Sequence, residues 1–469
     1  MKVDFSKLDR AFNPKCVAVV GDKQESNFNW LRSHSSFKGK LCSVQIDPRE
    51  IEGIKALGVT NYLSLMDVPE PVDLAIVAVP RTVATRVLED CIRKELPAAH
   101  FYTAGFSESE SEEGIRLERL LTERAEQTNF HLIGPNCMGV FNPRIGLGMG
   151  AAQLGEFTGQ VGFISQSGSH AVTFNREAHL QGVNINKSVS LGNGVVLGPS
   201  EYLEYFGHDP EIKMIGMFLE GVRDMRRFLK VLREVSARKP VVIWKGGRTE
   251  AGKRAIASHT ASLAVSHAIW NAAVKQSGAI QASSMEELID VLKALLYLPS
   301  IYGDRVAITG GSGGQSVALT DVFSEAGLTV PLLAKESLDE LATIYTRVGG
   351  GYHNPVDTAN PSNKHMKRIV EILMRDTNTD NLVLLMGARG ATGPISDLIE
   401  SMVDLRRKTS KPLTVILSCS FTPEQVQNAR DIMHKLQDGG IPAFLSLERG
   451  ASALRKALDY YRLKQSIAQ

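Results

Sequence analysis

The chain has 469 residues, which suggests about three domains. Lysine and arginine together number 53 and aspartate and glutamate 51, so the net charge at pH 7 is +2. This balance argues against a strongly basic nucleic-acid binder and an acidic disordered tail, and the hydrophobic fraction of 43% is that of an ordinary globular protein.

Short apolar runs rich in β-branched residues alternate with segments of helical period along the whole chain. Runs this apolar predict parallel strands buried on both faces, and their alternation with helices predicts α/β domains. The expected strands are 17–20, 74–79, 162–164, 214–219, 241–244, 306–308, 382–386 and 413–417, and the expected helices include 226–236 and 285–296.

An apolar run leads directly into a glycine- or serine-rich loop three times, at Gly21, at 165–169 and at 310–314. These loops are about one domain length apart. We therefore predict three doubly wound modules, each opening with its own strand–loop–helix turn. Boundaries are expected near 146–159 and near 299–303.

The first module begins like a dinucleotide-binding fold, but residues 22–27 after Gly21 lack the further glycines of that fingerprint. Asp47 stands where an acidic residue would hold a ribose, and with the glycines missing we favour a simple strand end for it. NAD binding is thus a weak interpretation. The loops 103–106 and 134–139 follow apolar strands, where open α/β sheets bind ligands, although ordinary turns would also explain them.

The second module contains the loop 165–169, sequence SQSGS, between a predicted strand and a helix. Its amides and hydroxyls would meet at a helix N-terminus, which favours an anion. The segment 192–194 forms a second such turn. Glu220 ends the predicted strand 214–219, so it could point into an active crevice and hold an imidazole, or it could be an ordinary surface carboxylate.

The segment Lys245–Arg254 carries four cations and one anion and is rich in glycine, so we expect it to be mobile. His259 follows between Ser258 and Thr260. A neutral imidazole beside a cationic loop suits covalent phosphoryl transfer. The alternative is that Ser258 or Thr260 caps a helix and His259 is merely exposed. In the third module, 310–315 and 353–357 could form a second anion site, but we favour structural turns for both.

In chain order, these residues resemble the α-subunit part of NDP-forming acyl-CoA synthetases, the ADP-forming acetate–CoA ligase group related to succinyl-CoA synthetase. The resemblance covers nearly the whole chain. The matching segments are Ile133–Cys137, Phe163–Gly168, Ser190–Asn193, Leu219–Gly221, Lys245–Thr249, Ser258–Thr260 and Asn354–Asp357.

The resemblance implies an α/β protein with a Rossmann-like CoA-binding domain at 1–147, a flavodoxin-like ligase domain with a phosphohistidine loop at 148–299, and a second one at 300–469. The implied reaction forms an acyl-CoA from a small carboxylic acid through an acyl phosphate. His259 falls on the phosphorylated histidine and Glu220 on the glutamate that supports it. The implied phosphate-binding residues are Ser165, Gln166, Ser167, Gly168, Gly192 and Asn193. The residues implied to hold coenzyme A are Gly21, Val79, Pro80, Ala104, Gly105, Phe106, Pro135, Asn136 and Cys137.

No part of the sequence resembles an ATP-grasp domain, so ATP or ADP with Mg²⁺ is expected on a separate ATP-grasp β-subunit in a hetero-oligomer. Three departures from the family pattern stand out: 22–27 in place of a glycine-rich loop, Ala261 in place of a glycine, and 194–198 without acidic residues. The first two favour the alternative, a non-catalytic regulatory protein that binds CoA or acyl-CoA. Retention of His259, Glu220 and the serine loop favours the enzyme. An NAD-dependent dehydrogenase is the third interpretation, after the ligase and the regulatory protein.

The sequence also predicts a cytoplasmic protein that binds no membrane and holds no metal site. No stretch approaches the about 20 consecutive apolar residues of a transmembrane helix, and the N-terminal segment has no apolar core of a secretory signal. The five cysteines are widely spaced and form no CxxC pair, so neither a disulfide framework nor a zinc site is expected.

Overall fold

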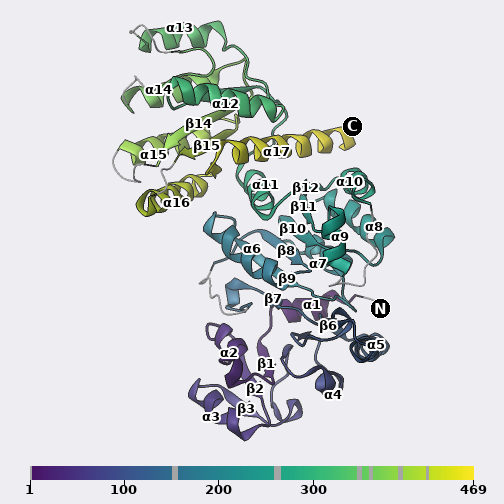
Figure 1. The fold of residues 1–469 in the computed structure, drawn as a ribbon. Helices are drawn as coiled ribbons and strands as arrows, with labels where there is room; N and C mark the ends of the chain where they lie inside the picture. Colours follow the sequence, from purple (N-terminus) through teal and green to yellow (C-terminus); the bar gives the residue numbers. More distant parts are fainter. Residues whose placement is uncertain are drawn as a thin grey trace. The chain divides into compact units, whose positions relative to one another are not determined.

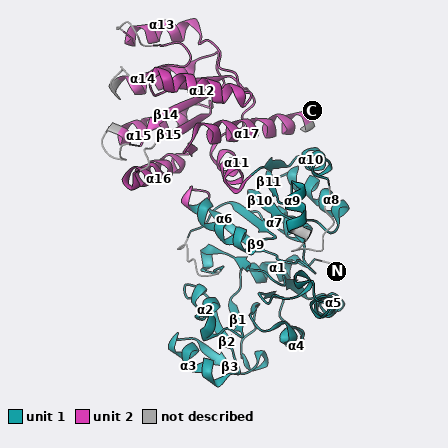
Figure 2. Cartoon of the chain, in the orientation of Figure 1, with its two compact units in different colours: residues 1–179, 184–283 teal, residues 180–183, 284–469 magenta. Residues whose placement is uncertain are grey.

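The computed structural model describes residues 3–149, 157–257, 266–345, 351–358, 363–388, 394–418 and 422–468. The chain forms two compact units, shown in Figure 2. Unit 1 consists of residues 1–179 and 184–283, and unit 2 of residues 180–183 and 284–469. Three parallel-sheet domains make up the α/β fold, as predicted, and two of the sheets lie in unit 1 (Figure 1).

The first sheet has the strand order β3-β2-β1-β4-β5-β6 with parallel pairs throughout, which is the Rossmann order. Its strands are β1 (Cys16–Val20), β2 (Lys40–Val44), β3 (Thr60–Tyr62), β4 (Leu74–Val77), β5 (Ala98–Phe101) and β6 (His131–Ile133). Its helices are α1 (Phe5–Phe12), α2 (Asn29–Ser33), α3 (Pro48–Ala56), α4 (Arg81–Arg93) and α5 (Glu112–Gln127). Every residue of β1 and β4 is buried, since helices cover both faces of the sheet.

The second sheet has the order β12-β11-β10-β8-β9-β7. From β9 to β12 this is the flavodoxin-like order 2-1-3-4-5. Its strands are β7 (Gly139–Phe141), β8 (Val161–Ser165), β9 (Ile185–Ser190), β10 (Met214–Leu219), β11 (Val241–Lys245) and β12 (Ile280–Ala282). Its helices are α6 (Gly168–Leu180), α7 (Pro199–His208), α8 (Met225–Ser236), α9 (Glu250–Ala257) and α10 (His267–Gln276). The strands of this sheet are parallel, as expected, except for β7, which pairs antiparallel with β9.

The two sheets of unit 1 share a hydrophobic core. Phe12 of α1 packs against Tyr205 and Phe206 of α7, with ring centroids 5.3 and 5.4 Å apart. β7 precedes the predicted boundary at 147 and yet belongs to the second sheet. The two sheets are thus joined by packing as well as by the chain, while the exact domain boundaries remain a prediction.

Unit 2 contains the third sheet, in which β13, β14, β15 and β16 pair in this order and in parallel. Its strands are β13 (Val306–Thr309), β14 (Asn381–Gly387), β15 (Leu413–Ser418) and β16 (Ala443–Phe444). Its helices are α11 (Met285–Tyr297), α12 (Gly313–Glu325), α13 (Lys335–Ile344), α14 (Asn363–Arg375), α15 (Pro394–Lys408), α16 (Pro423–Asp438) and α17 (Leu447–Ala468). The predicted strands and helices of all three modules are therefore present. The strand expected at 74–79 is β4, which ends at Val77.

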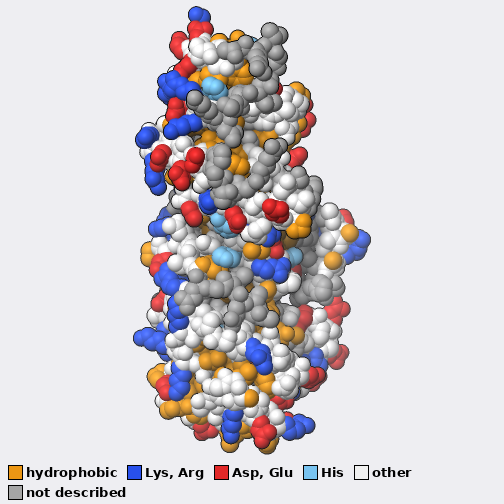
Figure 3. Space-filling view, turned by 90° about the vertical axis from the view of Figure 1, so that its left-hand side faces the viewer, with side chains coloured by type: hydrophobic (Ala, Val, Ile, Leu, Met, Phe, Trp, Pro, Cys, Tyr) orange, Lys and Arg blue, Asp and Glu red, His pale blue; other side chains and the backbone are white. Residues whose placement is uncertain are grey.

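On the face shown in Figure 3, positive and negative side chains of the described residues are interspersed. Among the described residues, no helix combines the length and the apolar character that crossing a membrane requires. The four cysteines in this part of the chain, Cys16, Cys42, Cys91 and Cys137, are buried free thiols.

Candidate active site

The serine loop lies between β8 and α6, as predicted. The Ser165 hydroxyl donates to the backbone oxygen of Ser167 at 2.7 Å and accepts from its amide at 3.2 Å. The Ser167 hydroxyl accepts from the amide of His170 at 3.3 Å, which caps the first turn of α6. The loop is therefore a rigid turn at a helix N-terminus, a place that favours a bound anion.

Gln166 connects this loop to Glu220. Its Oε1 accepts hydrogen bonds from the backbone amides of Glu220 at 2.5 Å and Gly221 at 2.9 Å. Glu220 directly follows β10, so the parallel strands β8 and β10 bring the two loops together at their carboxyl ends. The structure thus places the predicted phosphate loop and the predicted supporting glutamate side by side.

The segment Lys245–Arg254 is only in part the loop that its composition suggested. Lys245 ends β11, and α9 begins at Glu250, so Gly252 lies within a helix. The Lys245 ammonium donates to the backbone oxygens of Glu220 at 2.7 Å and Gly246 at 2.6 Å, and burial lowers its pKa. These bonds fasten the loop after β11 to the loop after β10. His259, with Ser258, Thr260 and Ala261, lies outside the described residues.

The turn 192–194 meets the loop 134–137 of the first sheet. The Asn193 amide donates to the backbone oxygen of Pro135 at 3.0 Å, and the Asn136 side chain donates to Asn193 Oδ1 at 3.4 Å. Gly192 has φ +52°, and a Cβ there would lie 2.2 Å from the Asn136 oxygen, so only glycine permits this approach. The predicted phosphate site and part of the predicted CoA site are therefore adjacent.

Asn193 makes a second connection to the first domain through its Nδ2, which donates to the carboxylates of Glu108 at 2.7 Å and Glu118 at 2.8 Å. Glu108 also accepts from the amide of Gly105 at 2.6 Å. The loop 104–109 after β5 is thus held against the turn after β9.

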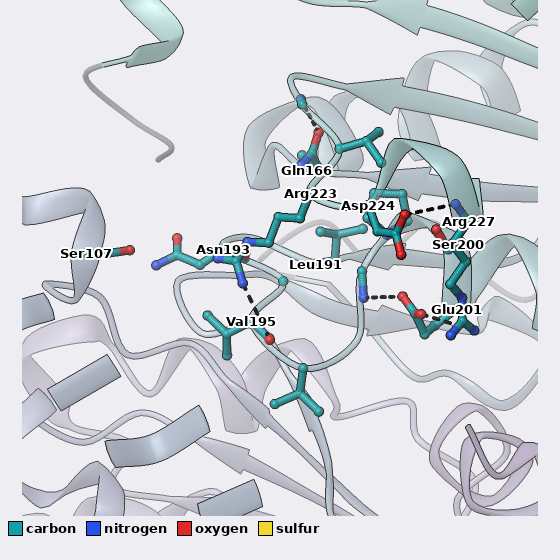
Figure 4. Close-up of a pocket in the computed structure, with 16 residues that line it drawn as sticks. Ser107, Gln166, Leu191, Asn193, Val195, Ser200, Glu201, Arg223, Asp224 and Arg227 are labelled. Carbon is teal, nitrogen blue, oxygen red and sulfur yellow. Dashed lines mark hydrogen bonds and ion pairs between the residues drawn. The ribbon is translucent and has the colours of Figure 1, made fainter. Parts of the chain in front are cut away.

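A pocket of about 160 Å³ opens beside Gln166, between the loops after β9 and β10 (Figure 4). In Figure 4, Gln166, Asn193 and Arg223 lie toward one side of it, and Ser200, Glu201 and Arg227 toward the other. The apolar part of the lining comes from Leu191, Val195, Val196, Pro199 and Val222. Gln166, Asn193 and Gly221 in this lining belong to segments that the sequence analysis singled out, whereas Val222 and Arg223 belong to no recognisable motif.

A larger crevice of about 560 Å³ lies at the carboxyl ends of β1 and β4, and Gly21 and Pro80 from the predicted CoA set line it. Trp30, Tyr102 and Lys23 also contribute, and a volume of this size suits a small-molecule ligand. Gly21 has φ +85°, and a Cβ there would lie 2.6 Å from the side chain of Val79, so this turn requires glycine.

The remaining residues predicted to hold CoA fall into two groups. Ala104 and Asn136 are exposed, and Gly105 is half-buried in its loop. Phe106, Pro135 and Cys137 are buried, and Phe106 and Cys137 pack in hydrophobic cores. Burial raises the pKa of the Cys137 thiol to about 12, so it is protonated at neutral pH. The buried side chains shape these loops rather than present polar groups to a ligand.

In and beside the loop 22–27, carboxylates occupy backbone amides that a glycine-rich loop would leave open. The buried Asp22 accepts from the amides of Lys23 at 3.1 Å and Leu31 at 2.9 Å, and Glu50 accepts from the amide of Gln24 at 2.7 Å. Burial raises the pKa of Asp22.

Asp47 begins α3 rather than standing open to a ribose. Its carboxylate accepts from the amide of Arg49 at 3.0 Å and pairs with the Arg49 guanidinium at 2.6 Å. Its pKa falls to about 2 through these bonds. This agrees with the structural interpretation that the sequence favoured for Asp47.

His170, which sequence reasoning passed over, lies in the first turn of α6 beside the serine loop. Its ring is 4.5 Å from Phe218 and 4.8 Å from Trp244, measured between centroids. Burial lowers the pKa of His170 and so disfavours the protonated form of this imidazole beside the serine loop. The sequence could have indicated this position, because His170 comes two residues after Gly168 of the serine loop.

In unit 2, the segment 353–357 is a structural element, as favoured. The Asn354 side chain accepts from the amide of Ile308 at 2.9 Å and donates to the backbone oxygens of Val306 and Pro331, each at 2.8 Å. Ser312 and Gln315 form a capping box at the start of α12. Both motifs thus hold the sheet and its first helix in place.

The comparisons with known proteins agree with this domain order. Residues 15–143 match the "CoA binding domain" family, and residues 158–295 match the "succinyl-CoA ligase like flavodoxin domain" family. The α-subunit of acetate–CoA ligase (ADP-forming) II from Pyrococcus furiosus is 31% identical over 456 residues, covering 95% of this chain and 96% of that subunit. The chain belongs to the ADP-forming acetate–CoA ligase family.

Two further relatives of the ADP-forming acetate–CoA ligase family are similar over nearly the whole chain. Acetate–CoA ligase (ADP-forming) I of Archaeoglobus fulgidus is 34% identical over 451 residues, which cover 95% of this chain but only 63% of that longer protein. The dinucleotide-forming acetyl-coenzyme A synthetase 1 of Ca. Korarchaeum cryptofilum, solved in complex with phosphate and ADP, is 31% identical with a TM-score of 0.83, covering 98% of this chain and 97% of that one. The chain therefore corresponds to the α-subunit, or α-part, of these acyl-CoA synthetases.

Proposed function

We propose that the chain is the catalytic α-part of an ADP-forming acid–CoA ligase, working with a separate ATP-grasp β-subunit that binds the nucleotide. The observation that supports this most is the pair of hydrogen bonds from the Glu220 and Gly221 amides to Gln166. They join the expected phosphate loop to the expected supporting glutamate. The contact of Asn193 with Pro135 extends the same site toward the CoA-binding domain.

The proposed reaction has two transfers at this site. A carboxylate oxygen of the acid takes the phosphoryl group from His259, so that the P–N bond breaks and an acyl phosphate forms. The CoA sulfur then attacks the acyl carbon and the C–S bond forms. Phosphate leaves with the electron pair of the C–O bond and takes up the thiol proton. The amides at the N-terminus of α6 stabilise the anionic phosphate in both steps.

Two residues beside the serine loop and at the end of β11, Glu220 and Lys245, fit this chemistry. Glu220 would accept a hydrogen bond from one ring nitrogen of His259 and keep the other nucleophilic. Lys245 offsets negative charge near Glu220, and its bonds to the backbone keep it in place.

The test is to incubate the full chain with acetyl-CoA and radiolabelled phosphate, with and without a candidate β-subunit. We expect an acid-labile, base-stable label that mass spectrometry maps to His259. His259→Ala should abolish it, and His365→Ala, at an exposed histidine of unit 2, should not. Label that survives in His259→Ala refutes the assignment.

A second candidate function is a regulatory protein that binds CoA or acyl-CoA without turnover. The occupied amides of Lys23 and Gln24 in the loop 22–27 favour it, since they depart from an open phosphate grip. A chain that binds CoA but acquires no label, even with a β-subunit present, would support this candidate against the enzyme.

A further inference from the structure

Asn193, in the turn after β9, forms a hydrogen bond with each of its polar atoms. Its backbone amide donates to the Pro135 oxygen at 3.0 Å, and its backbone oxygen accepts from Arg223 at 3.3 Å. Its Oδ1 accepts from the Asn136 side chain at 3.4 Å. The two hydrogens of its Nδ2 both point to the first domain.

Two carboxylates of the first domain accept these hydrogens. Asn193 Nδ2 donates to Glu108 Oε2 at 2.7 Å and to Glu118 Oε2 at 2.8 Å. A side-chain amide nitrogen carries two hydrogens, so each carboxylate takes one of them. Hydrogen bonds to a charged acceptor are about twice as strong as neutral ones, so the turn after β9 is firmly attached to the first domain. We call Glu108, Asn193 and Glu118 the carboxylate clamp.

Both carboxylates of the clamp are held in place within the first domain. Glu118 lies on α5, and its Oε2 also accepts from the Ser107 hydroxyl at 2.7 Å. Glu108 lies in the loop after β5, and its Oε1 accepts from the Gly105 amide at 2.6 Å. In Figure 4 the Asn193 side chain points toward Ser107. The clamp therefore connects α5 and the loop after β5 with the turn after β9.

The clamp lies between the two parts of the proposed site. Gly105 is among the residues expected to hold coenzyme A, and Gly192, next to Asn193, is among those expected to hold phosphate. In the proposed reaction the CoA sulfur must come within about 3–3.5 Å of the acyl carbon, and a misplacement of about 1 Å can cost about a hundredfold in rate. A connection that fixes the CoA loop against the phosphate turn controls this distance. Both Nδ2 hydrogens of Asn193 are used within the chain, which favours a positioning role over direct contact with phosphate.

We propose that the carboxylate clamp is a positioning device for the thioester step, in which Glu108 and Glu118 act through Asn193 to set the distance between the CoA thiol and the acyl phosphate. The inference rests on the proposed function and adds two carboxylates to which that function assigns no role. The clamp is needed when phosphate and acyl-CoA react, because that step uses loops of both domains. It is not needed when nucleotide phosphorylates the chain through the β-subunit, because CoA takes no part in that step.

Two labelling reactions of the full chain separate these steps. The first uses acetyl-CoA and radiolabelled phosphate, and the second uses radiolabelled ATP with a candidate β-subunit. We expect Asn193→Asp to slow the first reaction about a hundredfold, since three carboxylates then repel one another, and to change the second less than about threefold. Glu126→Ala, at an exposed glutamate of α5 outside the clamp, is the control and should change neither reaction.

An exchange of donors and acceptors tests the clamp without relying on a single substitution. Asn193→Asp combined with Glu108→Gln and Glu118→Gln places an acceptor between two donors, so both hydrogen bonds can form in the opposite direction. We expect this triple variant to recover the first reaction to within about tenfold of the unaltered chain. If Asn193 instead bound phosphate through its amide hydrogens, the aspartate would repel phosphate and the two glutamines would bring no recovery. Absence of recovery therefore overturns the proposal, as does an equal loss in both labelling reactions.

Hydrogen exchange tests the clamp even in a chain that acquires no label. With CoA bound, the amides of residues 192–195 should exchange more slowly in the unaltered chain, because the clamp carries the ordering of the loop after β5 to the turn after β9. Asn193→Asp should remove this effect of CoA, and the triple variant should restore it. If CoA leaves exchange at 192–195 unchanged in the unaltered chain, the proposal is wrong. Absence of label together with this effect of CoA shows instead that the proposed function fails although the clamp connects the two loops.

Discussion

The Oε1 atom of Gln166 accepts a hydrogen bond from the backbone amide of Glu220 at 2.5 Å. The Gln166 amide donates to the Phe218 oxygen at 3.1 Å, so the same residue is bonded both to β10 and to the loop that follows it. The position of Glu220 therefore depends on the serine loop, and any movement of one is passed to the other. Gln166 acts in this way as a positioning residue.

We expect Gln166→Ala to destabilise unit 1 by about 1–3 kcal/mol, because two backbone amides lose their acceptor. Hydrogen exchange at Glu220 and Gly221 should become faster, and labelling of His259 should slow. Gln166→Glu keeps an oxygen acceptor and should restore the protection from exchange. Gln276→Ala, at an exposed glutamine of α10, is the control. Unchanged exchange at Glu220 in Gln166→Ala contradicts the positioning role.

The loop after β1 leads to a prediction about the thiol substrate. Since the amides of Lys23, Gln24 and Leu31 are bonded to carboxylates, they are not available to a pyrophosphate. By calorimetry on the full chain, we expect CoA to bind more tightly than NAD, and pantetheine to bind within about tenfold of CoA. Affinity for CoA about a hundredfold above that for pantetheine would contradict this account.

A pair of variants on α3 tests the same loop. Glu50→Gln removes a charge that accepts from the Gln24 amide, so CoA binding should improve while pantetheine binding stays the same. Glu52→Gln removes an exposed charge of the same helix and should change neither.

The sequence was sufficient to predict those strands and helices that a local pattern of apolar residues determines. The apolar run at 214–219 became β10, and Glu220 followed it as expected, because a buried parallel strand needs a continuous apolar run. It was insufficient for β7, whose three residues are too few for a pattern. It also failed at α9, where three glycines between 246 and 252 suggested a loop although the helix begins at Glu250.

Contacts between distant loops escaped the sequence for a different reason. The bonds of Asn193 to Glu108 and Glu118 join residues 85 and 75 positions apart, and no spacing rule connects them. Arg223 is one arginine among many until the structure shows that its neighbours are carbonyl oxygens rather than carboxylates. Such relationships arise from tertiary packing of the two sheets, which the periodicity of single elements does not encode.

Three buried histidines predict how unit 1 responds to acid. Burial lowers the pKa of His34 to about 4, of His100 to about 3 and of His131 to about 4, all from 6.5. Below pH 6.5 the unfolded chain therefore binds more protons than the folded chain, and the stability of unit 1 should fall from pH 6.5 to about 4. Each histidine contributes up to about 1.4 kcal/mol per pH unit in this range.

Tryptophan fluorescence can follow this transition, because Trp30, Trp244 and Trp270 all lie in unit 1. His131→Gln should reduce the pH slope by roughly one third, since glutamine can still accept the 2.9 Å bond from the Asp4 amide without titrating. His208→Gln, at an exposed histidine of α7, should leave the slope unchanged. A stability that is flat between pH 6.5 and about 4 would refute the role of these histidines.

A buried charge cluster in unit 2 gives a prediction about stability. Asp290 of α11 binds Arg449 of α17 through two bonds, of 2.5 and 2.9 Å. Lys293 lies 3.8 Å from Asp290, donates to the Ala443 oxygen at 3.1 Å and is fully buried. Burial lowers the pKa of Lys293 to about 8. The Asp290 carboxylate therefore compensates the charges of both Arg449 and Lys293 in the protein interior, where the dielectric constant is low.

Removing the carboxylate should accordingly cost more than removing the lysine. Asp290→Ala leaves both cations without a counter-charge, and we expect a loss of about 3–5 kcal/mol. Lys293→Met leaves the Asp290–Arg449 pair intact and only the Ala443 oxygen without a donor, at about 1–3 kcal/mol. Urea unfolding followed by circular dichroism, with tryptophan fluorescence to identify the unit 1 transition, measures both. If Lys293→Met is the more damaging change, the cluster is held by the lysine's packing against its neighbours and the charge argument is wrong.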